Sequence, residues 1–265
     1  MFSKKLRQSG EVKLLSVVVP AYRQEKTIKK DLERLVEVLG QLRYPFEIVC
    51  VVDGETDGTG KEARKVRNSR VRVVGYKDNR GKGWAVRYGM ERTKGDVVAF
   101  IDAGMDINPN GLAMCLEHFL WYGADVVVGS KRHPASKVAY PWQREVLSWG
   151  YQFLVWLLFG FSVRDTQVGL KVFRREVLEA VLPRLVVKQW AFDIEMLAVA
   201  RHLGFGRIYE APVELKLDFG GGSALTSGKW WRTLWLMLWE TLAVFYRLYF
   251  LQYYEDDNRE NWVKF

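Results

Sequence analysis

Two carboxylates, Asp102 and Asp106, follow directly on the apolar run Val97–Ile101. A short β-branched run of this kind is typical of a buried strand, and open α/β sheets bind ligands where such strands end. Carboxylate oxygens on a loop at that edge suit a hard divalent cation that also contacts substrate phosphates. The alternative is that Asp106 merely caps a helix that opens at Pro109.

Further polar side chains follow other predicted strands. Tyr22 and Glu25 come after the run that ends at Pro20, and Asp53 follows the second run. Asp53 is placed to accept hydrogen bonds from a base or a ribose. The glycine-rich turn around Lys82 opens a helix whose backbone N–H groups and dipole suit phosphate. Alternatively, it is only a glycine turn with a solvated lysine.

Two common nucleotide-binding motifs are absent from the sequence. The third glycine of the dinucleotide fingerprint is replaced by Val86, and Gly60-Lys61 is followed by Glu62 instead of Ser or Thr. These departures argue against a dehydrogenase and against a P-loop NTPase.

Strand-like and helix-like patterns alternate through the first half of the chain, which predicts a mostly parallel sheet wrapped by helices. The predicted strands are residues 14–20, 46–52, 71–75, 97–101 and 124–129, and the predicted helices are residues 25–39, 57–67, 82–92 and 109–121. Beyond these we expect helices at 146–159 and 192–203 and a strand at 207–210.

The composition fits a well-packed basic protein. The chain has 265 residues, of which 49% are hydrophobic, and a formal net charge of +9. This charge implies an anionic partner such as a nucleotide, a phosphorylated lipid or a membrane surface. A nucleic acid is disfavoured because the aromatic residues gather in one apolar segment instead of alternating with cations. Two isolated cysteines and an amino terminus without an apolar core predict a cytoplasmic protein.

Two long apolar segments need separate interpretations. Residues 146–163 are diluted by polar residues, which favours a buried or half-buried helix over a membrane span. Residues 230–254 combine Trp and Tyr with flanking cations, typical of an amphipathic helix on an anionic membrane surface, although a core or dimer helix is the alternative. Gly220–Ser223 is predicted to be a flexible joint. We therefore expect a sheet domain of residues 1–219, able to fold alone, and a unit of residues 220–265 with the helix and an acidic tail.

Five segments resemble, in this order, the family 2 glycosyltransferases, which have a GT-A fold. They are residues 19–22, 53–59, 79–90, 129–132 and 165–171. Within that family the likeness is to dolichol-phosphate mannose synthase and polyprenyl-phosphate glucosyltransferase, and the last segment is more similar to the glucosyl-type enzymes. The resemblance extends from about Leu14 to Leu217. It implies a UDP- or GDP-linked sugar as donor, UDP-glucose being favoured, and a polyprenyl or dolichyl phosphate as acceptor.

The resemblance also assigns residues to the donor site. The nucleotide sugar would contact Pro20, Ala21, Tyr22, Glu25, Asp53, Lys82, Asp102 and Ala103. Asp102 matches the first carboxylate of the family's Asp-x-Asp metal motif, whereas the second falls on Gly104. We expect Asp106 to supply the missing carboxylate, so that Asp102 and Asp106 hold Mg²⁺ or Mn²⁺. The alternative is weak metal binding and impaired catalysis.

A second set of residues is assigned to the acceptor and to catalysis. The lipid phosphate would contact Lys131, Arg132, Arg144, Ser148 and Lys171, although a lone cation is more often just a surface residue. The catalytic residues would be Asp102, Asp106, Asp165, Gln167 and Arg144, with Asp165 and Gln167 shaping the sugar pocket. Asp193 and Glu195 resemble a later acidic pair of the family, but Asp193 could equally be a helix cap.

The implied reaction is an inverting displacement in which a lipid phosphate oxygen attacks the anomeric carbon and a nucleoside diphosphate departs. A phosphate monoester is already anionic at neutral pH, because its second pKa is near ~6, so positioning and charge stabilisation should dominate. We expect such an enzyme on the cytoplasmic face of the membrane as a peripheral protein. Two alternatives are a family 2 transferase with a carbohydrate acceptor and a non-catalytic nucleotide-binding membrane protein.

Overall fold

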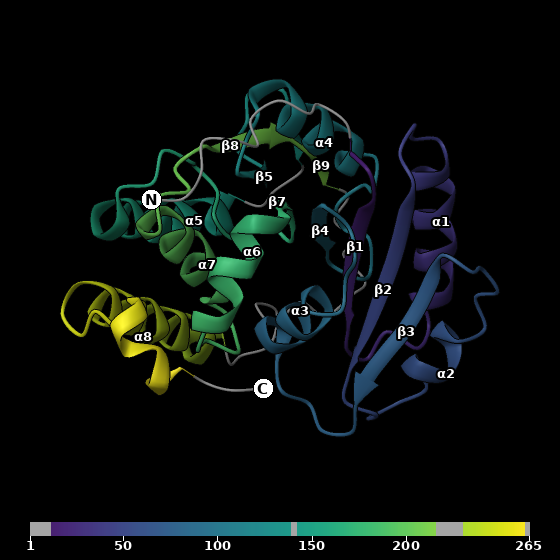
Figure 1. Cartoon of the computed structure of the whole chain (residues 1–265), viewed down its shortest axis with the longest axis horizontal. Coiled ribbons are helices and arrows are strands. Elements are labelled where there is room, and N and C mark those ends of the chain that lie inside the picture. The colour runs from purple at the N-terminus through teal and green to yellow at the C-terminus, as the bar shows by residue number, and fades with distance from the viewer. Residues whose placement is uncertain (1–11, 139–141, 216–229, 263–265) are drawn as a thin grey trace.

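The computed structural model describes residues 12–138, 142–215 and 230–262, and its centre is a seven-stranded sheet with the order β3-β2-β1-β4-β7-β5-β8 (Figure 1). The strands are β1 (Leu15–Ala21), β2 (Phe46–Asp53), β3 (Val71–Tyr76), β4 (Val97–Ile101), β5 (Val126–Ser130), β7 (Leu170–Arg174) and β8 (Ile208–Pro212). They pair in parallel except for β7, which is antiparallel to both β4 and β5. The prediction of a mostly parallel α/β sheet is confirmed. Two short strands, β6 (Lys137–Val138) and β9 (Glu214–Leu215), pair separately.

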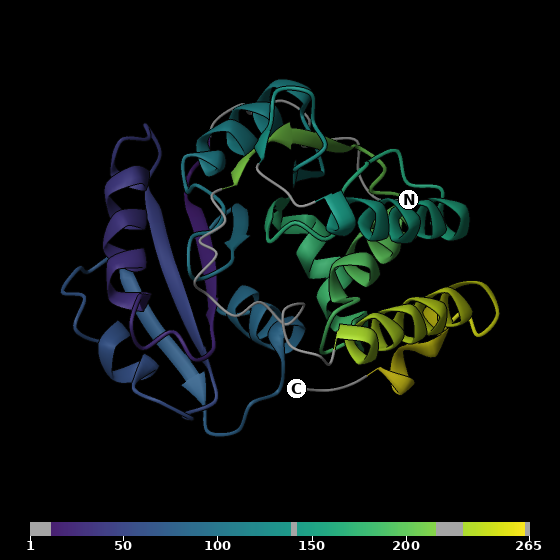
Figure 2. The same cartoon turned by 180° about the vertical axis from the view of Figure 1, so that it is seen from behind.

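Helices pack on both faces of the sheet (Figures 1 and 2). One hydrophobic cluster gathers the buried sides of α1 (Ile28–Gly40), α2 (Thr59–Ala63) and α4 (Gly111–Tyr122), and includes both cysteines, Cys50 and Cys115. The opposite cluster gathers α3 (Lys82–Met90), α5 (Trp142–Phe159), α6 (Arg175–Val181) and α7 (Phe192–His202). A short 3₁₀ turn, η2 (Leu182–Arg184), follows α6.

Strand β1 shows how the sequence produces these two faces. Val17 and Val19 are buried in the cluster with α1, whereas Val18 is buried in the cluster with α3. Side chains of a strand alternate between the faces of a sheet, so a run of valines supplies both cores at once. The carboxyl ends of β1, β2 and β4 consequently lie at one edge, as the parallel register requires.

Strand β7 and helix α6 lie where the sequence predicted neither a strand nor a helix. The run Leu170–Arg174 contains Lys171, and a lysine interrupts the apolar pattern that indicates a central strand. The side chain of Lys171 is nevertheless fully buried, which is rare for this residue type. Because β7 runs antiparallel, its first residue lies at the edge where β4 ends, and the loop before it enters the candidate site.

Helix α8 (Trp230–Tyr249) packs on the same face as α5 and α7 (Figure 1). Val244, Leu248 and Tyr254 are buried in the core cluster of that face, and the hydroxyl groups of Thr241 and Tyr151 form a 2.7 Å hydrogen bond. The helix ends at Tyr249, earlier than predicted, and a 3₁₀ turn, η3 (Asp256–Asn261), follows. The predicted joint 220–223 lies outside the described residues.

Two observations bear on the predictions for the carboxyl-terminal segment. The acidic tail is not simply solvated, since Asp256 pairs with Arg184 and Glu255 contacts His202. In the part of the chain that the structure describes, no helix combines the length and the apolar character that a membrane crossing needs.

Candidate functional site

The candidate site is built around Asp102, the first residue after β4. Its Oδ2 atom accepts a 2.7 Å hydrogen bond from the Nζ atom of Lys82, which opens α3. Burial favours the neutral amine, but the carboxylates of Asp102 and Asp193 outweigh it and raise the pKa of Lys82 above its ordinary value. Lys82 is therefore charged at neutral pH and places a cation at this edge of the sheet.

The second oxygen of Asp102 fits a metal ligand. Its Oδ1 atom is buried and has no hydrogen-bond partner among the described residues. A buried carboxylate oxygen without a donor is costly unless a cation or a substrate group satisfies it. Asp106 lies exposed at the far end of the same loop. Among the described residues, no cluster of three or more His, Cys, Asp or Glu side chains is suited to a metal ion. Any cation at Asp102 would thus need ligands from substrate phosphates or water as well.

The loop that carries these carboxylates has a strained backbone. Gly104 and Met105 have φ angles of 87° and 52°, both in the left-handed region. The buried carboxylate of Asp31, on α1, holds this conformation by accepting a 3.0 Å hydrogen bond from the Gly104 N–H. Ala103 lies in the same turn and is partly exposed. Strain of this kind is common at ligand sites, where the surrounding structure enforces it.

Asp53 organises the neighbouring turn. Its carboxylate is buried and accepts hydrogen bonds from the Asn79 side chain at 2.9 Å and from the N–H groups of Arg80 and Gly81 at 2.8 and 3.1 Å. The next donors, on Gly83 and Trp84, bond to a carbonyl outside the turn. These four backbone N–H groups are therefore bonded within the protein, which does not support the expectation that they bind phosphate.

The residues at the end of β1 differ in their exposure to solvent. Ala21 is buried, Pro20 is partly exposed, and the Tyr22 ring is 40% exposed with the Arg23 guanidinium 5.2 Å from its centre. Glu25 accepts a 2.9 Å hydrogen bond from the Gly58 N–H, which ties β1 to the start of α2. An exposed aromatic ring beside an ordered carboxylate could stack on a planar base.

The loop before β7 lies directly against Asp102. The Asp102 N–H donates a 2.9 Å hydrogen bond to the Gly169 carbonyl. At the other end of the loop, Asp165 is buried and accepts a 3.2 Å hydrogen bond from the Lys131 N–H, with the Lys131 ammonium 3.9 Å away. Between them, the Nε2 atom of Gln167 is buried without a hydrogen-bond partner among the described residues. Asp165 and Gln167 thus lie on the segment that contacts Asp102, and Lys131 contacts this segment through Asp165.

Lys171 and the later acidic pair occupy the core instead of the acceptor surface. The Lys171 ammonium is fully buried, pairs with Asp193 and donates a 2.8 Å hydrogen bond to the Val168 carbonyl. This placement does not support the expectation that Lys171 contacts the acceptor, because its ammonium is fully buried and bonded to Asp193 and Val168. Asp193 is therefore no simple helix cap. Glu195 is also buried and accepts hydrogen bonds from backbone N–H groups and from the Tyr254 hydroxyl.

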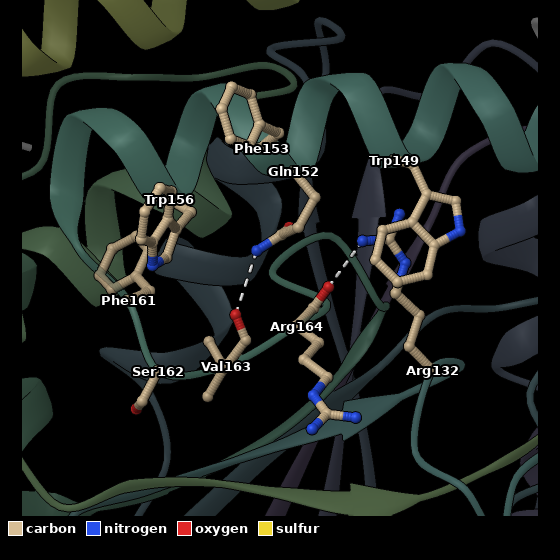
Figure 3. A pocket seen from close by; sticks show the side chains of 9 residues that line it. All are labelled: Arg132, Trp149, Gln152, Phe153, Trp156, Phe161, Ser162, Val163 and Arg164. Carbon is tan, nitrogen blue, oxygen red and sulfur yellow. Dashed lines mark hydrogen bonds between the residues drawn. The ribbon is translucent and has the colours of Figure 1, made fainter.

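Arg132 lines a separate apolar pocket (Figure 3). Its guanidinium donates to the Ser148 hydroxyl at 2.7 Å and to the Arg164 carbonyl at 2.9 Å, and lies 4.4 Å from the centre of the Trp149 ring. The pocket has a volume of about 350 Å³ and is lined by Arg132, Trp149, Gln152, Phe153, Trp156, Phe161, Ser162, Val163 and Arg164. Arg144 lies on α5, but its side chain is outside the described part of the structure.

The aromatic face of α5 was not assigned a role from the sequence. Trp149, Phe153 and Trp156 are 53%, 62% and 54% exposed. Their spacing of four and three residues places them on one side of a helix, a signal that the sequence contains but that a buried helix would also produce. The exposure of these three side chains in the structure shows that this side of α5 is not packed in the core.

The sequence is similar to those of known enzymes. The dolichyl-phosphate beta-glucosyltransferase of Drosophila melanogaster is 35% identical over 205 residues, which cover 71% of this chain and 63% of that protein. The enzyme of the same name from Homo sapiens is 34% identical over 207 residues, with the same coverage of each chain. The chain thus spans less than two thirds of the length of these relatives.

A solved structure shares the fold. Glucosyl-3-phosphoglycerate synthase from Mycobacterium tuberculosis, crystallised with Mn²⁺, UDP and phosphoglyceric acid, has a TM-score of 0.66 and 22% sequence identity. The match covers 88% of this chain and 78% of that one. The profile described as "Glycosyl transferase family 2" matches residues 16–182, which include most of β1, all of β4, Asp102 and the loop before β7. Since the matched region holds more than half of the chain and the edge where its polar residues gather, this protein belongs to glycosyl transferase family 2.

Proposed function

We propose that this protein transfers glucose from a nucleotide sugar, UDP-glucose in the favoured case, to a polyprenyl or dolichyl phosphate. The observation that carries the proposal is the loop 164–169. At one end Arg164 lines the cation-rimmed apolar pocket, and at the other Gly169 contacts Asp102. One short segment thereby joins a surface suited to an amphiphilic phosphate with a carboxylate suited to a donor site. The names of the relatives supply the sugar and the acceptor class.

The donor would lie over Lys82 and Asp102. The Lys82 ammonium would face the negative charge of the diphosphate, and Asp102 would keep that ammonium in place. A bound Mg²⁺ or Mn²⁺ would neutralise the departing diphosphate, with Asp102 and Asp106 as its protein ligands. Tyr22 and Glu25 would border the nucleoside.

The acceptor phosphate would be held by Lys131 and Arg132 and would attack the anomeric carbon with inversion. An anionic phosphate needs no strong base, so the main contribution of these residues is to fix the nucleophile and offset its charge. The buried amide of Gln167 has an unsatisfied donor and could bind a sugar hydroxyl. Asp165 holds Lys131 from below.

The hydrocarbon chain of the acceptor would occupy the pocket on α5. Most of its lining residues are apolar, and the two arginines among them, Arg132 and Arg164, match the charge of a lipid phosphate. Outward-facing aromatic side chains continue on α8, where Trp231, Trp235 and Trp239 are 62–70% exposed. We propose that both helices rest on an anionic membrane surface, with the protein peripheral on the cytoplasmic side.

The test is a transfer assay with defined components. Purified protein is incubated with radiolabelled UDP-glucose and a short polyprenyl phosphate, with Mn²⁺, with Mg²⁺ or with a chelator. We expect a glucosylated lipid that forms only with a divalent cation. GDP-mannose in place of UDP-glucose tests the sugar and the base.

Three other results would contradict the proposal. Transfer to an oligosaccharide but not to the lipid would indicate a carbohydrate acceptor. Nucleotide binding without hydrolysis or transfer would indicate a non-catalytic protein. Equal transfer in the presence of a chelator would exclude the metal-assisted form.

A further inference from the structure

Glu240 lies on the inner side of the aromatic helix α8, next to the exposed Trp239. Its Oε2 atom accepts hydrogen bonds from the N–H groups of Trp190 and Ala191, both at 3.0 Å. Ala191 is the residue that caps the start of α7, and no side chain of its own caps that helix. A carboxylate from a different helix thus satisfies the amino terminus of α7, where a negative charge is favourable.

The segment 186–191 is held at both of its ends. Glu195 accepts hydrogen bonds from the N–H groups of Val186 and Val187 at 3.0 and 2.8 Å, while Glu240 holds the end at Trp190. Glu195 is itself fixed by the Tyr254 hydroxyl at 2.8 Å. Both anchors therefore depend on the carboxyl-terminal segment of the chain.

Between these anchors, the carbonyl of Lys188 meets the first turn of α3. It accepts hydrogen bonds from Gly83 N–H at 2.9 Å and from Trp84 N–H at 3.4 Å. The contact is tight, because a β-carbon on Gly81 would lie 2.6 Å from the Lys188 carbonyl oxygen, and one on Gly83 would lie 2.6 Å from Phe192. The turn of α3 that carries Lys82 therefore rests directly on the segment that Glu240 holds.

We infer that Glu240 is a positioning residue for the donor site. It fixes the segment 186–191, whose Lys188 carbonyl fixes the start of α3 and with it the Lys82 ammonium beside Asp102. The inference rests on the proposed function in so far as Lys82 binds a nucleotide diphosphate. It makes the helix with the exposed tryptophans part of the support of the donor site.

The experiment compares the full-length chain with Glu240→Ala, Glu240→Gln and Thr241→Val. Thr241→Val is the matched control, because it removes the buried hydrogen bond between α8 and Tyr151 without touching the segment 186–191. In Glu240→Ala we expect the Kd for UDP with Mn²⁺ and the KM for the nucleotide sugar to rise about tenfold, with kcat within about twofold; a tenfold change is what one charge-assisted hydrogen bond contributes. Glu240→Gln keeps an acceptor oxygen and should remain within about threefold of the wild type.

Amide hydrogen exchange supplies a readout that does not depend on nucleotide binding. Exchange at Gly83 and Trp84 should accelerate in Glu240→Ala and stay slow in Thr241→Val. Unchanged exchange at these two amides, or an equal rise of KM in Thr241→Val, would overturn the inference. Accelerated exchange in a protein whose wild type binds no UDP would support the positioning role of Glu240 and contradict the proposed function instead.

Discussion

The backbone of Gly169 lies against the carboxylate of Asp102, so closely that a β-carbon at position 169 would fall 1.9 Å from Asp102 Oδ2. Gly169→Ala should therefore turn the carboxylate away from Lys82. We expect transfer to fall by about 100-fold or more, since small displacements of reacting groups carry penalties of that size. Steady-state kinetics with UDP-glucose and polyprenyl phosphate measure the effect.

Gly40→Ala is the control for this substitution. A β-carbon there meets no atom within 4 Å, and Gly40 ends helix α1. The control should keep full activity and gain up to about 1 kcal/mol of stability, because Ala favours the helix. Full activity in Gly169→Ala would show that the contact with Asp102 is unimportant.

The metal assignment is tested at three positions of one loop. Asp102→Asn should abolish transfer, and Asp106→Asn should impair it nearly as much. Gly104→Asp should be tolerated: the nearest side-chain atom to a β-carbon there is 3.8 Å away, although the φ angle of 87° imposes some strain. Mn²⁺ titrations of the three variants give the apparent affinities. Wild-type activity in Asp106→Asn would contradict its role as a ligand.

Lys131→Ala should weaken acceptor use and leave donor binding intact. A charge-assisted hydrogen bond to the phosphate is worth ~1.5–3 kcal/mol, so the KM for polyprenyl phosphate should rise by roughly tenfold or more. Isothermal titration with UDP provides the comparison. Arg43→Ala removes an exposed cation near α4, on the other face of the sheet, and should change neither quantity. A parallel loss of UDP affinity in Lys131→Ala would refute the acceptor role.

Asp31 should make stability depend on pH. Burial raises the pKa of Asp31 above its ordinary value of 3.8, although the Gly104 N–H opposes the shift. The folded state then holds the proton more tightly than the unfolded state, so this group lowers stability as the pH rises above 3.8. Asp31→Asn keeps an oxygen for Gly104 and removes the titration. Urea unfolding in metal-free buffer from pH 4 to 7 should show the variant gaining on the wild type; parallel curves would exclude this effect.

The membrane role of α8 can be tested without removing the helix. Trp235→Ser and Trp239→Ser alter side chains that are 70% and 65% exposed, so the melting temperature should not change. Each should weaken binding to anionic vesicles by about tenfold, given the apolar area that a Trp buries. Trp121→Ser alters a tryptophan on α4 that is 86% exposed and should have no effect. Equal losses in all three variants would argue against a specific α8 surface.

Deleting residues 220–265 is not a clean test of the membrane role of α8. The expectation of a sheet domain that folds alone treated residues 220–265 as an appended unit. In the structure, Tyr254 bonds to the buried Glu195, and Arg184 donates to the Tyr254 carbonyl at 2.8 Å. Truncation would remove one partner from each of these buried polar groups, and we expect it to destabilise the whole fold.

Among the strands predicted from sequence, β1 and β4 have the strongest apolar signal. Both strands are rich in valine, and all of their residues are buried except Pro20. Strand β7 was missed because the lysine in it is neutralised by Asp193, 22 residues away, a pairing that no local pattern reveals. The antiparallel insertion of β7 is likewise a property of the assembled sheet.

The candidate site was predictable to a similar degree. The position of Asp102 after a buried strand follows from local sequence, and the structure places it at the sheet edge. A contact of Asp53 with a base or ribose stays a prediction, and in the structure its carboxylate also holds the turn at Arg80 and Gly81. Both roles require a hydrogen-bond acceptor directly after a strand, so the local sequence does not distinguish between them. Glu240 gave no signal at all, because its partners lie 49 and 50 residues away.

The two thiols occupy the face of the sheet opposite α8. Cys50 and Cys115 are unpaired, fully buried beside α1 and α4, and burial raises the pKa of each to about 12. They should stay unreactive toward alkylating reagents while that face is closed, because the thiolate is the reactive form. The alkylation rate of these thiols therefore measures how often the side of the sheet covered by α1 and α4 opens. A ligand or vesicle that loosens α8 would leave the alkylation rate unchanged, whereas unfolding of the sheet would increase it.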